Sequence, residues 1–330
     1  MKPQDDNKVA YVVVAWNNKG LLKECIDSIH AQGHQKHKII LVDNDSKDGT
    51  ITYIHENYPD IEVLEQTKNY GFAKGNNIGI KKALEDSEVK YVVLLNTDAR
   101  LGPNWADTLV AFAQQKPQAA MLQTITLDYY DHGIIDSTHV YLSRLGQATQ
   151  GSFRRPIPYN FDIAPQKVFG CNAAAMLITR AFIEAQPFKD FFDETMFMYL
   201  EDVDVAARAT IMGWDNYVVP HARAYHMGSA SSGSNPSFSL YMTFRNNSSL
   251  MVKNLPLLLL IRQLITIPKS DRASIRHLKR IGKKEDAKYI IKGRLASLKY
   301  LPIFMIKRRK LKKYRTIDTD YLWCLMRRGF

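Results

Sequence analysis

The chain has 330 residues, 45% of them hydrophobic and 24% charged, and its formal net charge is +12. Such a chain is long enough for one large α/β domain with an appendage, or for two domains. Its three cysteines, Cys25, Cys171 and Cys324, are far apart and show no CxxC spacing. This spacing argues against a zinc ribbon or a disulfide framework and favours a reducing cytoplasm.

The positive charge is concentrated at the C-terminal end. Residues 251–330 contain 22 Lys and Arg against 5 Asp and Glu, whereas residues 1–250 contain 23 against 28. The N-terminal segment, Met1–Lys8, is polar and lacks the apolar core of a signal peptide. No segment reaches the roughly 18–20 apolar residues that a spanning helix needs. We therefore expect a cytoplasmic protein that does not cross the membrane.

Strands and helices alternate in the first half of the chain. Short apolar, β-rich runs predict strands at Val9–Ala15, Lys38–Val42, Ile61–Glu65 and Tyr91–Leu95. Apolar residues at helical spacing predict helices at Gly20–Gln32, Thr50–Tyr58, Gly75–Glu85 and Trp105–Gln115. Strand–helix alternation with short connections indicates an α/β fold with a mostly parallel sheet and helices on both faces.

The second half of the chain is less regular. Glycines and prolines between Met121 and Pro165 predict antiparallel strands and loops. The apolar, small-residue run Val168–Thr179 predicts a buried strand near a site. Helices are expected at Arg180–Ala185 and, after a polar and aromatic loop, at Asp202–Met212.

The buried strand Tyr91–Leu95 runs directly into Asn96-Thr97-Asp98. At the carboxyl end of a parallel strand, such a step offers oxygen atoms to a divalent cation or a ligand. Asn and Asp also favour turns, so these residues taken alone are better explained as caps of the following turn.

Polar residues also follow the strand Lys38–Val42. Asp43 is placed to accept hydrogen bonds from a nucleobase or a ribose, although an ordinary acidic turn explains the segment Asp43–Gly49 as well. No GxGxxG sequence follows the first strand, and the chain contains no GxxxxGK[ST] loop. Hydride transfer and P-loop phosphoryl transfer are therefore disfavoured.

The segment Asn69–Asn77 combines glycines, amides and one lysine at a predicted helix start. Backbone N–H groups at such a position approach phosphate closely, and Lys74 would neutralise its charge. The alternative is a flexible loop without a ligand.

Adjacent carboxylates follow the apolar and aromatic run Phe197–Leu200. Asp202 is suited to cap the next helix, but a carboxylate beside aromatic side chains also acts as a general base toward a hydroxyl. His226 ends a short predicted strand before a Gly/Ser loop. A lone histidine is more often packed than ligating, yet with Asp98 it would complete an O/N site suited to Mn²⁺ or Mg²⁺.

The order of these segments resembles glycosyltransferase family 2, whose members have the GT-A fold. The similarity spans roughly residues 8–254 and includes Arg245-Asn246 and Lys253-Asn254-Leu255-Pro256. Within the family the chain is most similar to bacterial rhamnosyltransferase-like enzymes of cell-surface polysaccharide assembly. The matching segments are Val12–Asn17, Asp43–Gly49, Asn69–Asn77, Asn96–Asp98, Gly170–Met176, Tyr199–Asp204 and His226.

The resemblance implies an inverting transferase (EC 2.4) that moves a sugar, rhamnose among the candidates, from a nucleoside-diphosphate donor to a glycan hydroxyl. Residues 1–254 would form the GT-A domain. Asp202 would deprotonate the acceptor, Glu201 would orient it, and Asp98 with His226 would hold Mg²⁺ or Mn²⁺ at the donor diphosphate. Asn96 replaces the first Asp of the family's usual Asp-x-Asp step and is a weaker ligand. The implied nucleotide-sugar site comprises Trp16, Asn17, Asp43, Asn69, Gly71, Lys74, Asn76, Asn77, Asn96, Thr97, Cys171 and Asn172.

Residues 255–330 alternate apolar stretches with basic runs such as Lys307–Lys310. This pattern is typical of amphipathic helices on an anionic membrane surface, here the inner face of the cytoplasmic membrane. That location suits a lipid-linked acceptor. The alternatives are a solvated basic tail and RNA binding, for which no RNA-binding motif is present.

Two other functions remain open at this point. A nucleotidyltransferase would want a basic phosphate-binding loop near Ala15–Gly20, where only Lys19 is basic. A non-catalytic, membrane-bound scaffold would retain the sheet with a degenerate site.

Overall fold

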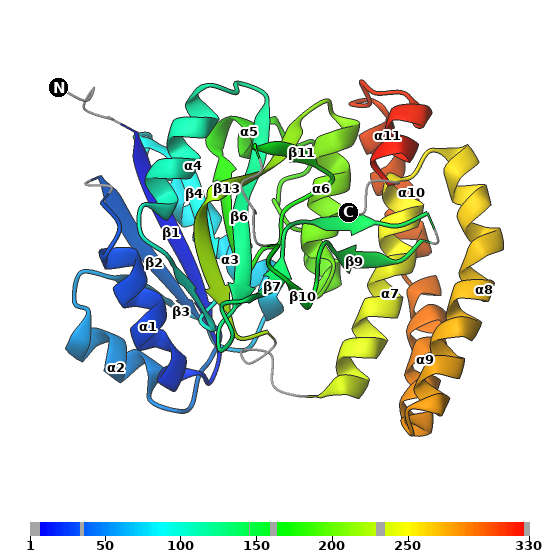
Figure 1. The fold of residues 1–330 in the computed structure, drawn as a ribbon, viewed down its shortest axis with the longest axis horizontal. Coiled ribbons are helices and arrows are strands. Elements are labelled where there is room, and N and C mark those ends of the chain that lie inside the picture. Colours follow the sequence, from blue (N-terminus) through cyan, green and yellow to red (C-terminus); the bar gives the residue numbers. More distant parts are fainter. Residues whose placement is uncertain (1–6, 34–35, 145, 159–163, 229–234, 327–330) are drawn as a thin grey trace.

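A central sheet flanked by helices organises the molecule. The computed structural model describes residues 7–33, 36–144, 146–158, 164–228 and 235–326 (Figure 1). The strand order through the sheet is β10-β7-β6-β12-β4-β1-β2-β3. Its first-half strands are β1 (Lys8–Ala15), β2 (His37–Asp43), β3 (Glu62–Glu65) and β4 (Val89–Leu95), and all their mutual pairings are parallel.

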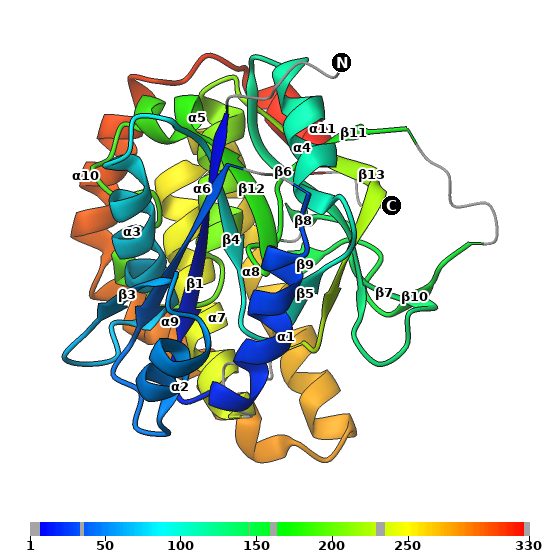
Figure 2. The ribbon, with the colours of Figure 1, turned by 90° about the vertical axis from the view of Figure 1, so that its left-hand side faces the viewer.

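The parallel strands are buried on both faces, as their continuous apolar sequences predict. Val12, Val42 and Leu94 face one core, while Val13 and Leu41 face the other. Helix α3 packs on the first face and helix α1 on the second (Figure 2). The helices in this half are α1 (Lys19–His30), α2 (Thr50–Asn57), α3 (Gly71–Leu84) and α4 (Trp105–Gln114).

The other half of the sheet is mixed. Strand β12 (Ala175–Thr179) runs antiparallel to both β4 and β6 (Ala119–Asp128), while β13 (Asp215–His226) runs parallel to β6. The sheet is therefore parallel on the β1–β4 side and mixed beyond it. The remaining strands are β5 (Ala99–Leu101), β7 (Ile134–Ser137), β8 (Val140–Leu142), β9 (Ala148–Gln150), β10 (Arg155–Pro156) and β11 (Gln166–Val168).

The segment predicted as one strand, Val168–Thr179, is divided. Strand β11 ends at Val168 and β12 begins at Ala175. Between them Gly170 lies against helix α6 (Glu201–Ile211), where an added Cβ would come within 2.2 Å of the Ala206 Cβ atom. Residues 169–174 belong to neither strand, so the single-strand prediction was wrong.

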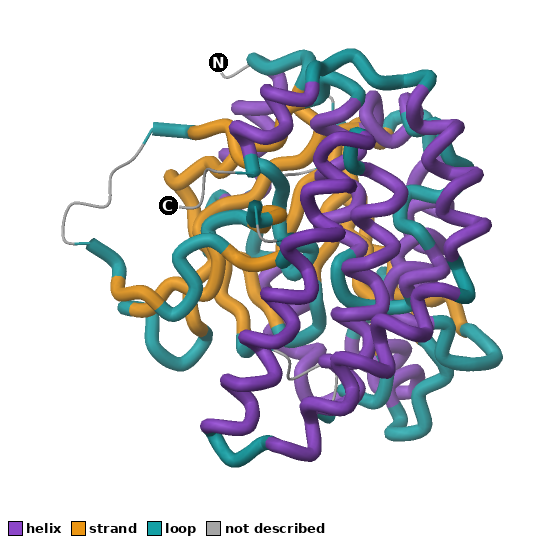
Figure 3. The backbone as a smooth tube through the Cα atoms, turned by 90° about the vertical axis from the view of Figure 1, so that its right-hand side faces the viewer, coloured by secondary structure: helices purple, strands orange, loops and turns teal. Residues whose placement is uncertain are grey.

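The C-terminal region is helical, as expected, and it packs against the sheet domain. Figures 1 and 3 show its helices side by side along one side of the molecule. Leu311, Leu322 and Leu325 are buried in the same core as Val12, so this region is not a solvated tail. The helices of the second half are α5 (Arg180–Ala185), α6, α7 (Pro236–Asn254), α8 (Leu257–Arg280), α9 (Ala287–Leu298), α10 (Leu301–Lys312) and α11 (Thr319–Leu325), with 3₁₀ turns η1 (Glu194–Met196) and η2 (Lys284–Asp286).

Within the described ranges, no helix combines the length and the apolar character that crossing a bilayer requires.

Candidate active site

Two adjoining cavities lie where the parallel strands end. The first, which we call the strand-end cavity, has a volume of about 590 Å³ and is bounded by residues that follow β1, β2 and β4 and by the start of α3. The second, the carboxylate cavity, has a volume of about 450 Å³ and contains Glu201 and Asp202 in its wall. Phe72, Asn96 and Met198 line both cavities. The two spaces therefore meet at the carboxyl end of β4.

The strand-end cavity brings together five of the predicted site residues. These are Trp16, Asn69, Gly71, Asn96 and Thr97. Trp16 lines the cavity and is 43% exposed. Predicted Asn17 lies beside it, where its Oδ1 atom accepts a hydrogen bond from the Lys47 backbone N–H at 2.7 Å.

Two amides that the sequence analysis missed also line this cavity. Asn18 donates to the Thr97 hydroxyl at 2.6 Å, and Asn44 donates to the Gly71 carbonyl at 3.2 Å. Asn44 follows β2 directly, so its position in sequence was a usable signal. Asp43, predicted to hold a base, is fully buried and accepts the Ser46 N–H at 2.9 Å. In this arrangement Asn44 lines the cavity and Asp43 supports the turn behind it.

Helix α3 begins at Gly71, four residues before its predicted start. Gly71 has φ of +82°, and a Cβ there would come within 2.5 Å of the Phe197 ring, so only glycine fits. The Asn69 side chain accepts the Gly71 N–H at 2.8 Å, and the Phe197 carbonyl accepts the Ala73 N–H at 3.0 Å. A distant loop therefore caps the helix, which local periodicity did not reveal.

Three predicted residues of this segment point elsewhere. Asn76 donates to the Phe72 carbonyl within the helix at 2.9 Å, and Asn77 donates to the Phe192 carbonyl at 2.9 Å. The Lys74 ammonium lies over the Tyr70 ring and 3.8 Å from Glu194 Oε2. Asn77 therefore fixes the helix to the loop at Phe192, while Asn76 bonds only within the helix. None of the three side chains is among those that line the two cavities.

Cys171 and Asn172 lie in the turn after Gly170. Cys171 is buried and its thiol contacts the Tyr217 carbonyl at 3.6 Å. Asn172 lines the carboxylate cavity, where its Oδ1 atom accepts the Ala174 N–H at 2.9 Å and its own N–H donates to Gln123 at 2.6 Å. Asn172 is therefore the member of the pair that reaches the site.

Glu201 and Asp202 begin helix α6 in the wall of the carboxylate cavity. Burial raises the pKa of Asp202 to about 6. Burial, together with the charge of Asp202, raises the pKa of Glu201 to about 8. Of the two carboxyl groups, Glu201 holds a proton more readily and Asp202 ionises more readily. An ionised carboxylate that accepts a proton thus lies next to a carboxyl group that donates a hydrogen bond.

Asp98 and His226 lie together, Asp98 in the turn between β4 and β5 and His226 at the end of β13, which pairs with β5. His226 Nε2 is 3.4 Å from Asp98 Oδ1, and its Nδ1 is 2.9 Å from Asp136 Oδ2. Although burial opposes it, hydrogen bonds to Asp136 and Asp98 raise the pKa of His226 to about 10. The sequence analysis missed Asp136, because strand β7 carries no motif and lies 90 residues before His226.

The Asp98–His226 pair fits a divalent cation. Mg²⁺ and Mn²⁺ at a diphosphate commonly take one or two protein ligands, with phosphate oxygens and waters completing the coordination. His226 Nε2 lies 3.4 Å from Asp98 Oδ1, so an ion held by both would have to displace the proton that His226 carries at this nitrogen. Among the described residues, no group of three or more His, Cys, Asp or Glu side chains is arranged to hold a metal. The donor diphosphate would have to supply the remaining ligands.

The sequence of the sheet domain identifies its family. Residues 11–184, more than half of the chain, match the family described as Glycosyl transferase family 2. The chain belongs to this family and is a glycosyltransferase, as the sequence analysis predicted. Family membership sets aside the nucleotidyltransferase alternative.

Two curated relatives indicate the branch within the family. The chain is 26% identical over 245 residues to N-acetylglucosaminyl-diphospho-decaprenol L-rhamnosyltransferase of Mycobacterium tuberculosis, a match that covers 69% of this chain and 79% of the relative. It is 25% identical over 235 residues to Rhamnosyltransferase WbbL of Escherichia coli K12, covering 66% and 83%. The predicted resemblance to rhamnosyltransferase-like enzymes is confirmed.

Solved structures confirm the GT-A fold. GalNAc-T7, crystallised with UDP, GalNAc and Mn²⁺, matches with a TM-score of 0.58 and 15% identity over 75% of this chain and about half (48%) of its own. The mannosyltransferase PcManGT of Pyrobaculum calidifontis, in complex with GDP-Man and Mn²⁺, matches with a TM-score of 0.52 and 16% identity over 93% and 85%. TarS 1–349 of S. aureus matches with a TM-score of 0.53 and 15% identity over 96% and 92%.

Proposed function

We propose that this glycosyltransferase transfers a sugar, which we propose to be rhamnose, to a lipid-linked glycan. The configuration at the anomeric carbon of the sugar is inverted in the transfer. The observation that carries the proposal is that the Glu201–Asp202 pair lines a cavity which opens, at Asn96, into the strand-end cavity. The names of the two relatives support the sugar, and the diphospho-decaprenol in one of them supports the acceptor class.

The strand-end cavity is suited to the nucleotide. It lies at the carboxyl ends of parallel strands, where open α/β sheets bind ligands. Asn18, Asn44 and Asn69 offer amides for base and ribose, and the exposed Trp16 ring offers a stacking surface. The N-terminal end of α3 adds a partial positive charge that favours a diphosphate. The donor sugar would then reach Asn96 and enter the carboxylate cavity.

The carboxylate cavity is suited to the acceptor. Asp202 accepts the proton of the acceptor hydroxyl while the hydroxyl oxygen bonds to the sugar C1 and the C1–diphosphate bond breaks. A single displacement of this kind inverts C1. Glu201, which keeps its proton near neutral pH, donates a hydrogen bond that orients the acceptor.

Asp98 and His226 are the residues that would hold Mg²⁺ or Mn²⁺. When bound, the cation neutralises charge on the leaving nucleoside diphosphate. Asp136 accepts from His226 Nδ1 and so fixes the orientation of the ring. The Mn²⁺ in two of the matching structures supports this assignment.

Helix α8 offers a surface for the membrane that carries a lipid-linked acceptor. Its first half exposes five apolar side chains on one face, each between 48% and 64% exposed: Leu257, Leu258, Ile261, Leu264 and Ile265. Arg262, Lys269 and Arg272 on the same helix supply positive charge. An amphipathic helix of this kind binds anionic leaflets, so we place the enzyme at the inner face of the cytoplasmic membrane.

Replacing the base tests the mechanism. With dTDP-rhamnose, Mn²⁺ and a short-chain N-acetylglucosaminyl-diphospho-prenol, we expect D202N to lower nucleoside diphosphate release by about 10²–10⁴-fold, the contribution of a general base. The wild-type rate should rise with pH around pH 6, because only ionised Asp202 accepts a proton, and fall again around pH 8, where Glu201 loses the proton with which it orients the acceptor. D190N, at an exposed loop carboxylate, should keep the wild-type rate. A D202N enzyme as fast as D190N would refute the assignment.

Replacing Asp98 tests the cation site. Thermal shifts with dTDP-rhamnose should be larger with Mn²⁺ than with EDTA, because a ligand that binds the native state raises the unfolding temperature. In D98N this cation-dependent increment should disappear while the shift in EDTA persists. An unchanged increment in D98N would remove Asp98 from the site.

The membrane surface is tested by matched triple substitutions. We expect L258E/I261E/I265E on α8 to abolish co-sedimentation with phosphatidylglycerol vesicles, since burying each such side chain contributes about 1.5–3 kcal/mol. I291E/L295E/L298E on α9, which changes the charge equally at exposed positions, should lose much less. Equal losses in both variants would contradict a role for the α8 face.

A further inference from the structure

The loop that precedes the carboxylate pair has an unusual backbone. Phe197, Tyr199 and Leu200 have positive φ values of 61°, 70° and 68°. Bulky residues rarely adopt this conformation, and it persists only where the surroundings hold it. Because Glu201 and Asp202 follow Leu200 directly, whatever holds this loop also sets the position of the two carboxylates.

Helix α7 holds the loop through two buried side chains. The Asn246 amide nitrogen lies 2.9, 2.9 and 2.8 Å from the carbonyl oxygens of Met196, Met198 and Tyr199, to which it donates. Arg245 donates to the Met196 carbonyl at 2.9 Å and, through Nε, to the Asn246 Oδ1 atom at 2.9 Å. The guanidinium therefore fixes the amide that in turn fixes the loop.

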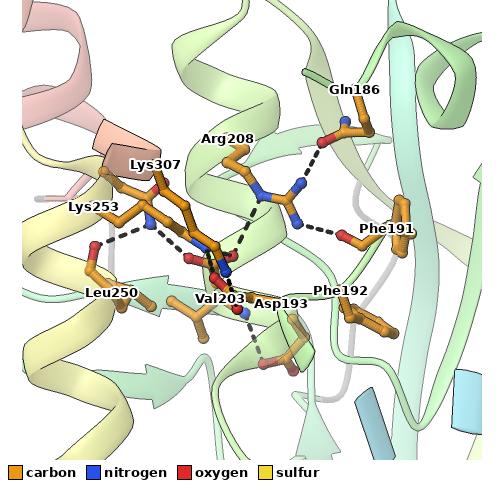
Figure 4. A network of polar contacts seen from close by, with 12 residues as sticks. Gln186, Phe191, Phe192, Asp193, Val203, Arg208, Leu250, Lys253 and Lys307 are labelled. Atoms are coloured by element: carbon orange, nitrogen blue, oxygen red, sulfur yellow. Dashed lines mark hydrogen bonds and ion pairs between the residues drawn. The ribbon is translucent and has the colours of Figure 1, made fainter. Parts of the chain in front are cut away.

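The other end of α7 holds helix α6. Lys253 Nζ lies 2.7 Å from Asp204 Oδ2 and 2.6 Å from Asp193 Oδ2, and Asn254 donates to Asp204 Oδ1 at 2.7 Å. The Lys253 and Asp204 side chains are 1% and 0% exposed. Asp204 stands two residues after Asp202 on α6, so the contact lies half a turn from the base (Figure 4 shows Lys253, Asp193 and the neighbouring side chains).

The network extends to the C-terminal region. Lys307 of α10 lies 2.6 Å from Asp193 Oδ1, and Arg308 donates to the Val252 and Leu255 carbonyls at the end of α7. Although burial opposes it, Lys253 and Lys307 hold the pKa of Asp193 well below its usual range. Buried ion pairs contribute little net stability compared with apolar packing. A role in fixing geometry accounts for their presence better than a role in stability.

We propose that helix α7 is a positioning element of the active site, in which Asn246 with Arg245, and Lys253 with Asn254, fix the loop 196–200 and helix α6 so that Asp202 faces the acceptor. Arg245 and Lys253 are eight positions apart on the helix, and so are Asn246 and Asn254. This spacing places each pair on the same side of the helix. The expected loss of kcat rests on the proposed transfer reaction. The expected loosening of the loop rests only on the contacts of helix α7 described above.

Two adjacent asparagines provide a matched test in the full chain. Asn246 and Asn247 are both buried, but Asn247 donates to the Gly146 carbonyl and accepts from Arg294, away from the loop. N246A should lower kcat with dTDP-rhamnose and the prenol acceptor at least about tenfold, the scale of a small misplacement of reacting groups. Donor affinity should change less than kcat. Amide hydrogen exchange in residues 196–205 should be faster in N246A than in N247A.

The outcomes separate the positioning role from a structural one. Equal losses of kcat in N246A and N247A, with equal exchange at 196–205, would overturn the proposal. If N246A does not fold, K307M is compared with K312M, a change at an exposed lysine of the same helix, and K307M alone should show faster exchange and slower turnover. If wild-type enzyme is inactive with these substrates, the proposed function fails, and the exchange comparison still decides the positioning role.

Discussion

The loop 196–200 is the constraint on which the arrangement of the site depends. Its Phe197 carbonyl accepts the Ala73 N–H and its Phe197 ring lies against Gly71, so the loop sets where helix α3 begins. Phe197 and Met198 line the strand-end cavity, and Met198 also lines the carboxylate cavity. Glu201 and Asp202 follow this loop directly, so its conformation sets their position. One turn with positive φ values therefore fixes both the start of α3 at the strand-end cavity and the two carboxylates of the carboxylate cavity.

Holding such a turn requires side chains from outside the sheet domain's first half. Asn246 and Arg245 supply the hydrogen bonds to the loop, and Lys253 supplies the charge that fixes Asp204. Lys307, which lies on α10 more than fifty residues after Lys253, also forms an ion pair with Asp193. The C-terminal helices thus have two different faces: one packs on helix α6, and the other, along α8, exposes apolar side chains beside basic ones.

Much of the fold could be predicted from the sequence because it depends on local patterns. The parallel strands are continuous apolar runs, and helix α5 begins and ends where predicted. The family's motifs identified Asn96, Asn172, Asp202 and His226, which all line one cavity. Contacts between distant segments were not predictable. Asp136 meets His226 from 90 residues away, and the start of α3 depends on a carbonyl in the loop before Glu201, which no periodicity in residues 69–85 reports.

The geometry of donor and base is the central claim, and a crystal structure of the D202N protein with intact dTDP-rhamnose and Mn²⁺ tests it most directly. We expect the nucleoside in the strand-end cavity, a manganese anomalous peak beside Asp98, and residue 202 on the face of the sugar C1 opposite the diphosphate. That arrangement is required for inversion by a single displacement. A nucleotide bound outside the strand-end cavity, or residue 202 on the same side of C1 as the diphosphate, would contradict the mechanism.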